Sequence, residues 1–201
     1  MFQVRIHGRG GQGVVTAAEL LAQSAFSEGR HAQAFPSFGS ERTGAPVVAF
    51  ARIADTAIRV REPVMAPNAL IVQDETLLRA IDVFSGLAPD GFVVINSKHS
   101  FADLGLGEFA STQDRLITVP ATEIAMEHLG RPVPNAVLLG AFAALTKIVS
   151  LKSVQDAINK RFSAKLAAGN SAAAAAAFEY VQSRLVEILP ASEKSGVAAH
   201  A

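Results

Sequence analysis

The sequence contains no cysteine among its 201 residues. Disulfide bonds, cysteine-ligated zinc sites and thiol nucleophiles are therefore excluded. The same absence excludes a cysteine-ligated iron–sulfur cluster within this chain. If such a cluster takes part in the function of the protein, another chain must hold it.

The sequence also lacks a net charge, because 18 Lys and Arg residues balance 18 Asp and Glu residues. A neutral chain has no overall field to attract a polyanion, so we expect no nucleic-acid partner. No apolar run approaches the roughly 18 residues that a membrane span requires, so we expect no span. Residues 2–6 follow a strand pattern rather than that of a signal peptide, which predicts a cytoplasmic protein.

Hydrophobic residues are plentiful: they make up 50% of the sequence, against 18% charged residues. The mean hydropathy of +0.29 is high for a soluble protein, and we expect part of the apolar surface to face partner subunits. A chain of 201 residues fits one domain. We assign residues 1–189 to that domain and residues 190–201 to a small, polar, flexible tail.

Apolar periodicity predicts strands at residues 2–7, 31–35, 44–53, 69–73, 91–96 and 116–119, with a short antiparallel companion at 58–60. It predicts helices at residues 14–28, 75–84, 121–129, 135–149, 153–162 and 172–189. Continuous apolar strands between helices are typical of a parallel sheet that is covered on both faces. The sequence therefore predicts an α/β fold: a Rossmann-like, mostly parallel sheet with helices on both faces, in a single domain. The helix at 135–149 is apolar enough to be buried on most sides, and Gly140 within it would allow another element to approach closely.

A glycine-rich loop, Gly8-Arg9-Gly10-Gly11-Gln12-Gly13, directly follows the first predicted strand and opens the first helix. Glycines in this position let backbone N–H groups approach a phosphate at the positive end of a helix. A tight structural turn that contacts only protein explains the same pattern equally well. The amide of Gln12 could tie the turn to a neighbouring segment.

A nicotinamide dinucleotide is a weaker interpretation of the loop. A Rossmann unit that binds NAD carries an Asp or Glu at the end of its second strand, where the carboxylate holds the ribose. Here Phe35-Pro36-Ser37 occupies that place. A stand-alone NAD(P)-binding dehydrogenase is therefore kept as the alternative function.

The loop lies within a longer stretch, RIHGRGGQGVVTAAELLA at residues 5–22, that closely resembles the opening of gamma subunits of pyruvate and related 2-oxoacid:ferredoxin oxidoreductases. The resemblance continues through FPSFGSERTGAPVVAFARI at 35–53, residues 59–62, 69–78 and 91–97, and EIAMEHLGRPVPNAVLLGAFAAL at 123–145. Several motifs in the same order are far more specific than one loop. Together they cover about residues 2–185, with small departures at Ser40 and in the alanine run at 172–177.

The resemblance implies a subunit of a 2-oxoacid:acceptor oxidoreductase. Such an enzyme decarboxylates a 2-oxoacid on thiamine diphosphate with Mg²⁺, passes electrons through [4Fe–4S] clusters to ferredoxin or another acceptor, and forms acyl-coenzyme A and CO₂. The implied partners are the alpha, beta and ferredoxin-like delta subunits, which would bind these cofactors. This gamma chain would then serve assembly or the coenzyme A path, and aliphatic, dicarboxylic and aromatic 2-oxoacids all remain open.

Four further residues are candidates for interface or coenzyme A contacts. Glu41 and Arg42 follow an aromatic–proline turn, where they could pair across an interface, reach an anionic ligand or form an ordinary surface ion pair. Lys98 follows a predicted strand at the carboxyl edge of the sheet, where open α/β folds bind ligands. Asn135 is suited to cap the helix that follows Pro134, and ligand contact is the alternative.

The other polar residues give no catalytic or metal site. The five histidines are scattered without the spacing of a metal site. The serines and threonines near residue 40 have no accompanying His and Asp arrangement for nucleophilic catalysis. We therefore predict no catalytic residue and no metal ligand in this chain.

Overall fold

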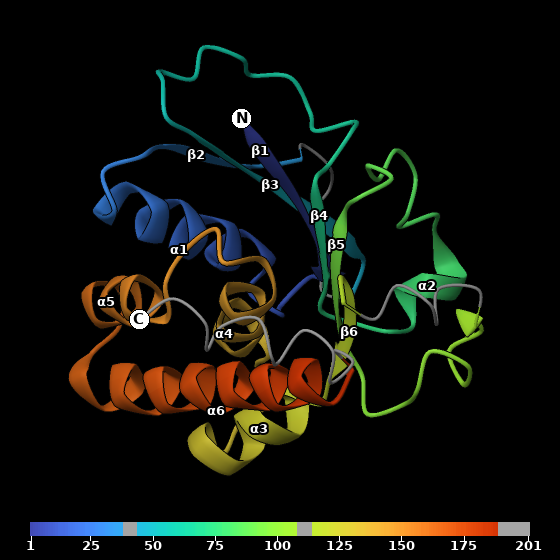
Figure 1. Ribbon diagram of the computed structural model, residues 1–201. Coiled ribbons are helices and arrows are strands. Elements are labelled where there is room, and N and C mark those ends of the chain that lie inside the picture. Colours follow the sequence, from blue (N-terminus) through green and yellow to red (C-terminus); the bar gives the residue numbers. More distant parts are fainter. Residues whose placement is uncertain (38–43, 108–113, 189–201) are drawn as a thin grey trace, which may run out of the picture.

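The computed structural model describes residues 1–37, 44–107 and 114–188, which form one α/β domain around a six-stranded sheet (Figure 1). The strands are β1 (Phe2–Arg9), β2 (His31–Pro36), β3 (Pro46–Ala54), β4 (Ala69–Val72), β5 (Phe92–Asn96) and β6 (Leu116–Val119). The helices are α1 (Val14–Ser27), α2 (Leu77–Ala80), α3 (Ala121–Leu129), α4 (Asn135–Thr146), α5 (Leu151–Arg161) and α6 (Ala164–Ile188). The tail at residues 190–201, predicted to be flexible, lies outside the described residues.

The sheet has the strand order β2-β3-β1-β4-β5-β6. Strands β1, β4, β5 and β6 pair in parallel, whereas β3 is antiparallel to both of its neighbours, β1 and β2. Only β3 therefore runs against the other strands of the described sheet. The predicted mostly parallel α/β sheet is confirmed.

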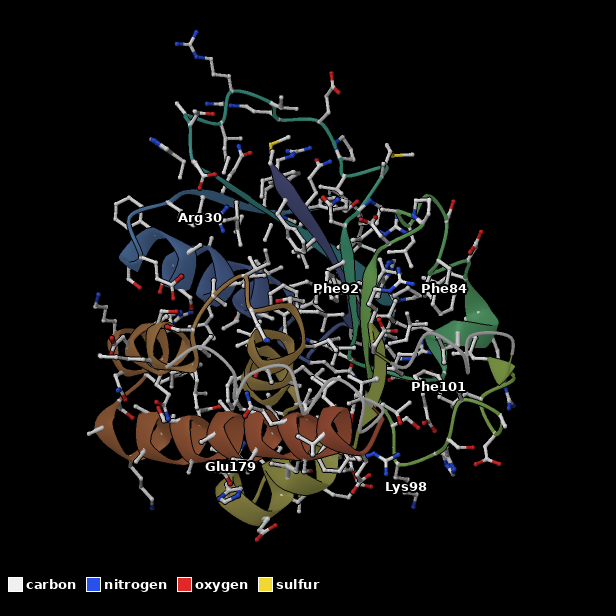
Figure 2. The ribbon with its side chains drawn as sticks, in the orientation of Figure 1. Arg30, Phe84, Phe92, Lys98, Phe101 and Glu179 are labelled. Atoms are coloured by element: carbon white, nitrogen blue, oxygen red, sulfur yellow. The ribbon has the colours of Figure 1, made fainter. Side chains whose placement is uncertain are left out.

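Helices lie on both faces of the sheet, as predicted, but they are divided unevenly. Helices α1, α3, α4, α5 and α6 gather on one side, and the short α2 lies on the other (Figure 1). The larger core fills the space under the five helices, where Ile6, Ile71 and Val94 point from the strands. Residues one position along, such as Leu70 and Val93, point to a smaller core, which loops and α2 cover. Phe84 and Phe101 lie on this thinner side (Figure 2).

Helix α4 is the centre of the larger core, and every residue from Asn135 to Leu145 is buried. A Cβ atom on Gly140 would lie 1.9 Å from the carbonyl oxygen of Ala174 in α6. A side chain at this position would therefore push two helices apart. Both predictions for this segment, burial on most sides and a close approach at Gly140, are confirmed.

The predicted strand at residues 58–60 is wrong, because this segment has no regular structure. Its backbone serves a buried cation instead. Arg52 on β3 is 1% exposed, and its guanidinium donates to the carbonyl oxygens of Val60 and Glu62 and lies 5.0 Å from the centre of the Phe35 ring. These carbonyl groups are turned toward Arg52 on β3, and no strand forms at residues 58–60.

The helix predicted at residues 75–84 is much shorter in the structure, where only Leu77–Ala80 is helical. The helix stops at Ile81, whose backbone is extended, with a φ of −145° and a ψ of 158°. Beyond this point the guanidinium of Arg5 on β1 donates to the carbonyl oxygens of Val83 and Ser85 at 2.9 and 2.6 Å. The other guanidinium contact is from Arg5 Nε to Nε2 of His7 at 3.0 Å.

No helix in the described ranges is both long enough and apolar enough to cross a membrane.

Candidate functional site

The glycine loop follows β1, and β1 is the strand at which the order of strands across the sheet changes direction. After β1 the chain passes through α1 to β2 and β3 on one side, and it then returns to build β4, β5 and β6 on the other side. The segments that follow β1 and β4 therefore lead to α1 and α2 on opposite faces of the sheet and leave a crevice between them. Open α/β sheets bind ligands at this kind of crevice.

Backbone conformation explains why glycines occupy the turn. Gly11 and Gly13 have φ angles of 97° and 71°, in the region that side-chain-bearing residues rarely adopt. Gly13 is the residue that caps the N-terminus of α1, and no described side chain caps it. The first N–H groups of α1 are therefore left to bind an anion, with the positive end of the helix dipole behind them.

Asp74 ties the glycine loop to the end of β4. Nε2 of Gln12 donates to Oδ2 of Asp74 at 2.9 Å, and Nε of Arg9 lies 3.3 Å from the same oxygen. The other side-chain atom of Gln12, Oε1, accepts from the backbone N–H of Arg9 at 2.7 Å. The prediction that Gln12 ties the turn to a neighbour is confirmed, because each polar atom of its amide bonds to another residue of the chain.

Electrostatics favour the charged form of Asp74. Burial by itself raises the pKa of this carboxyl, but hydrogen bonds from Thr76 and Gln12 and the charge of Arg9 together outweigh burial and lower the pKa. The guanidinium of Arg9 also donates to Oγ1 of Thr76 and to the carbonyl oxygen of Gly44. The loop is thus held rigidly before any ligand arrives.

Two hollows flank the loop, and the predicted site residues are divided between them. The first is a cavity of about 260 Å³ at the carboxyl ends of β4 and β5, lined by Gln12, Gln73, Asp74, Glu75, Asn96, Ser97, Lys98, Thr122 and Glu123. The second is about 210 Å³, lies at the N-terminus of α1, and is lined by Gly11, Gly13, Thr16, Leu129, Arg131, Val133, Asn135, Phe162, Leu166 and Asn170.

Lys98 lies in the first hollow, exposed at the carboxyl edge of the sheet beyond β5 (Figure 2). Gly8 and Gly10 border neither hollow; they shape the strand end and the turn. Gly8 is the last inward-facing position of β1, and Gly10 exchanges backbone hydrogen bonds with Gly44 and Ala45 at 3.2 and 2.9 Å. Glu41 and Arg42 lie outside the described residues.

Asn135 corrects one detail of the sequence-based interpretation. Pro134 occupies the capping position of α4, and Asn135 is the first residue of the helix. Its Oδ1 accepts from the N–H of Ala136 at 2.7 Å, while Nδ2 points toward the carbonyl oxygen of Gly13 at 3.5 Å. Asn135 therefore joins α4 to the glycine turn rather than capping α4 in the usual way.

Sequence reasoning missed two residues that the structure adds to the site. Arg131 is an exposed cation beside the uncapped N-terminus of α1, in the second hollow. Gln73 is fully buried against the first hollow, and neither polar atom of its amide has a hydrogen-bond partner among the described residues. A Cβ on Gly8 would lie 3.1 Å from Oε1 of Gln73. The only signal for Gln73 was a polar residue at the end of the apolar strand predicted at 69–73.

The arrangement can hold an anion but contains no reactive constellation among the described residues. The second hollow is lined by Thr16 and Arg131 beside the N-terminus of α1, which no side chain in the described ranges caps, and helix N-termini and guanidinium groups bind phosphates. Among residues 1–37, 44–107 and 114–188, no three His, Asp or Glu side chains gather to bind a metal ion. On the side of β1 away from β4, the neighbouring strand is the antiparallel β3, whereas in an NAD-binding Rossmann unit it is the parallel second strand.

Comparison with known proteins gives a consistent result. The family model for pyruvate ferredoxin/flavodoxin oxidoreductase matches residues 3–180. The pyruvate synthase subunit PorC of Methanothermobacter marburgensis is 49% identical over 179 residues, which are 89% of this chain and 97% of that protein. The pyruvate/ketoisovalerate oxidoreductases common subunit gamma of Pyrococcus abyssi is 46% identical over 182 residues, covering 90% of this chain and 98% of its own length.

Solved structures agree with this result. The crystal structure of the pyruvate oxidoreductase subunit PORC from Thermotoga maritima superposes with a TM-score of 0.74 at 34% identity, covering 89% of this chain and 95% of that one. The gamma subunit of a keto/oxoacid ferredoxin oxidoreductase from Geobacter sulfurreducens has a TM-score of 0.68 at 22% identity, covering 91% of this chain and 99% of that one. The second likeness supports the fold alone.

Proposed function

Because this chain belongs to the pyruvate ferredoxin/flavodoxin oxidoreductase family as a gamma-type subunit, we propose that it works in a complex that oxidatively decarboxylates a 2-oxoacid to acyl-coenzyme A and CO₂. The relatives are named for pyruvate and for ketoisovalerate, which favours an aliphatic 2-oxoacid. Thiamine diphosphate, Mg²⁺ and [4Fe–4S] clusters would be held by alpha, beta and delta companions, and electrons would leave to ferredoxin or a similar acceptor. The lack of cysteine in this chain supports that division.

The proposed contribution of this chain is to bind the phosphates of coenzyme A, in addition to assembly. The observation that carries this proposal is the hollow of about 210 Å³ at the uncapped N-terminus of α1, with Arg131 beside it. Coenzyme A is rich in phosphate, and backbone N–H groups together with a guanidinium bind phosphate well. The size of the hollow fits one part of coenzyme A, and companions would cover the rest.

The tie between Gln12, Arg9 and Asp74 supports the same role by holding the turn in place. A turn that is already in its binding conformation loses little conformational entropy when a ligand binds. In this proposal Gly11 and Gly13 allow the backbone to turn toward the anion, Asn135 positions Gly13, and Arg131 contacts the anion. None of these residues carries out the redox chemistry.

The test uses the complex reconstituted with its companion subunits. Replacing Arg131 by Ala removes a charged hydrogen-bond donor, which contributes about 1.5–3 kcal/mol, so the KM for coenzyme A should rise roughly tenfold to a hundredfold. The KM for the 2-oxoacid should stay unchanged. Lys165→Ala is the matched control, because Lys165 is exposed on α6 and lines neither hollow.

Two outcomes would count against the proposal. If Arg131→Ala impairs assembly while the remaining complex keeps its affinity for coenzyme A, the loop serves as a scaffold only. If the isolated chain instead binds NADH or NADPH saturably, measured by the fluorescence of the cofactor, the stand-alone dehydrogenase becomes the better interpretation.

A further inference from the structure

Strand β2 leaves one edge open. It pairs with β3 on one side, and no strand in the described ranges pairs with its other side. It is the outermost strand in Figure 1, with α1 alongside it and α5 next to α1. Outer strands usually carry charged residues or proline, which prevent the open edge from pairing with another chain. The six residues of β2, HAQAFP, include no Lys, Arg, Asp or Glu, and the one proline, Pro36, is the last residue of the strand.

The pairing of β2 with β3 shows which backbone groups face outward. The N–H of Ser37 donates to the carbonyl oxygen of Val48 at 2.8 Å, and Phe35 lies opposite Phe50 in the same ladder. Because backbone groups alternate along a strand, those of the odd-numbered residues point to β3. The N–H and C=O groups of Ala32 and Ala34 therefore point away from the sheet, beside side chains too small to hinder another strand.

An apolar groove runs directly beside this edge. It has a volume of about 780 Å³ and is lined by Ala22, Gln23, Phe26 and Ser27 of α1, Ala32 of β2, and Ala157, Lys160 and Arg161 of α5. The side chain of Phe26 is 72% exposed. A large aromatic residue exposed to this extent beside small apolar ones is typical of an interaction surface.

The rim of the groove is positively charged. Lys160 and Arg161 are exposed at the end of α5, and neither forms an ion pair with any described residue. No Asp or Glu lines the groove. A segment that binds here is therefore favoured if it combines an apolar side chain with a carboxylate.

We propose that the β2 edge and the groove between α1 and α5 together bind an extended segment of a companion subunit. The segment adds to the sheet as a strand beside β2, bonds to the backbone of Ala32 and Ala34, places an apolar side chain against Phe26 and brings a carboxylate to Lys160 and Arg161. Strand addition of this kind gains affinity from the backbone and specificity from side-chain pockets. The inference rests on the proposed function, because it requires a complex with companions.

A second copy of this chain fits the surface less well. Pairing of two β2 strands would bring together two grooves that both carry Lys160 and Arg161, while β2 itself supplies no carboxylate. Like charges would then face each other. The charge of the groove thus favours a different, acidic chain.

The test compares three variants with matched controls in co-expression with the companion subunits. Ala34→Pro removes an outward N–H without removing a bond to β3, a change that edge strands tolerate. Phe26→Ser and Lys160→Glu alter the groove. Met126→Ser changes a side chain that is 48% exposed on α3, and Lys165→Glu reverses an exposed charge on α6, so both serve as controls away from the groove.

We expect each of the three variants to fold, judged by urea unfolding of the isolated chain, and to bind the companions at least tenfold more weakly than the controls do. Failure of the wild-type chain to join any companion would overturn the proposed function itself. A wild-type chain that joins its companions, with all three variants joining equally well, would overturn only the binding surface. If the isolated chain forms dimers in sedimentation that Ala34→Pro abolishes, the occupant is a second copy and the companion segment is wrong.

Discussion

Replacing Gly13 by Ala tests how the glycine turn and α4 are fitted together. The backbone of Gly13 has a φ of 71°, and a residue with a side chain in this region costs about 1–2 kcal/mol. The added Cβ would also lie 2.4 Å from Nδ2 of Asn135. Asn135 would have to move, and disturbing its buried hydrogen bonds costs about 0.5–1.5 kcal/mol more.

The expected destabilisation is therefore about 1.5–3.5 kcal/mol, measured as the free energy of unfolding in urea. For a domain of this size each kcal/mol lowers Tm by about 2–4 °C, so a thermal scan should show a fall of roughly 3–14 °C. Gly11→Ala is the matched control. Its φ of 97° imposes backbone strain as well, but a Cβ there meets nothing within 4 Å.

A double variant separates the cost of the backbone strain at residue 13 from the cost of the steric clash with Asn135. With Asn135 replaced by Ala, the added methyl group on residue 13 has room, so Gly13→Ala should then cost only the backbone strain. The difference between the two backgrounds measures the coupling of the turn to α4. If Gly13→Ala is no more destabilising than Gly11→Ala, or costs the same in both backgrounds, the argument for a fitted contact is refuted.

Three further predictions concern the core, the buried histidine and the tie at Asp74. Gly140→Ala should destabilise the domain by about 3 kcal/mol or more in urea unfolding, because the Cβ collides with the backbone of α6; a loss under 1 kcal/mol would contradict this. Burial and the charge of Arg5 lower the pKa of His7 to about 4 from 6.5, so the unfolded chain binds more protons between these values. Stability should then fall by about 2 kcal/mol from pH 7 to pH 5, and His7→Gln should remove this part of the pH dependence. Asp74→Asn should destabilise by about 1–3 kcal/mol through the lost charged contacts, and unchanged stability in urea would argue against the tie.

Much of the fold could be predicted from the sequence where a local signal and the tertiary structure agree. The glycine loop between β1 and α1, the strand β6 and the helix α3 have strong local patterns, and the structure keeps their predicted positions. The fully apolar α4 was expected to be buried because no face of it is polar.

Two of the errors lie beside buried arginines. Arg52 on β3 and Arg5 on β1 donate to backbone carbonyls at residues 60, 62, 83 and 85, and no local pattern in the sequence indicates these long-range contacts. Helix α6 shows the opposite error, because it begins at Ala164, eight residues before the predicted start. Gly169 and Asn170 look like helix breakers, yet Gly169 allows α6 to pack closely on α3, and Nδ2 of Asn170 bonds within its own helix to the carbonyl oxygen of Leu166.

The candidate site was only partly predictable for the same physical reason. The loop was found because its glycines mark a backbone requirement, which is local. Arg131 and Gln73 join the site only through the packing of α3, α4 and β4 around the loop, and one polar residue in a sequence does not reveal which hollow it will face. Asn135 was found, but its contact with Gly13 required the fold.

The tie between Gln12 and Asp74 joins residues that are 62 positions apart, and Asn135 meets Gly13 across 122 positions. The glycine turn is thus encoded near the start of the chain but contacts segments that are translated much later. A nascent chain released after β3 would have every glycine of the loop and its backbone bonds to Gly44 and Ala45, but not its contacts with Asp74 and Asn135. Maturation of this region should accordingly be a late event in biosynthesis, completed only when α4 has docked.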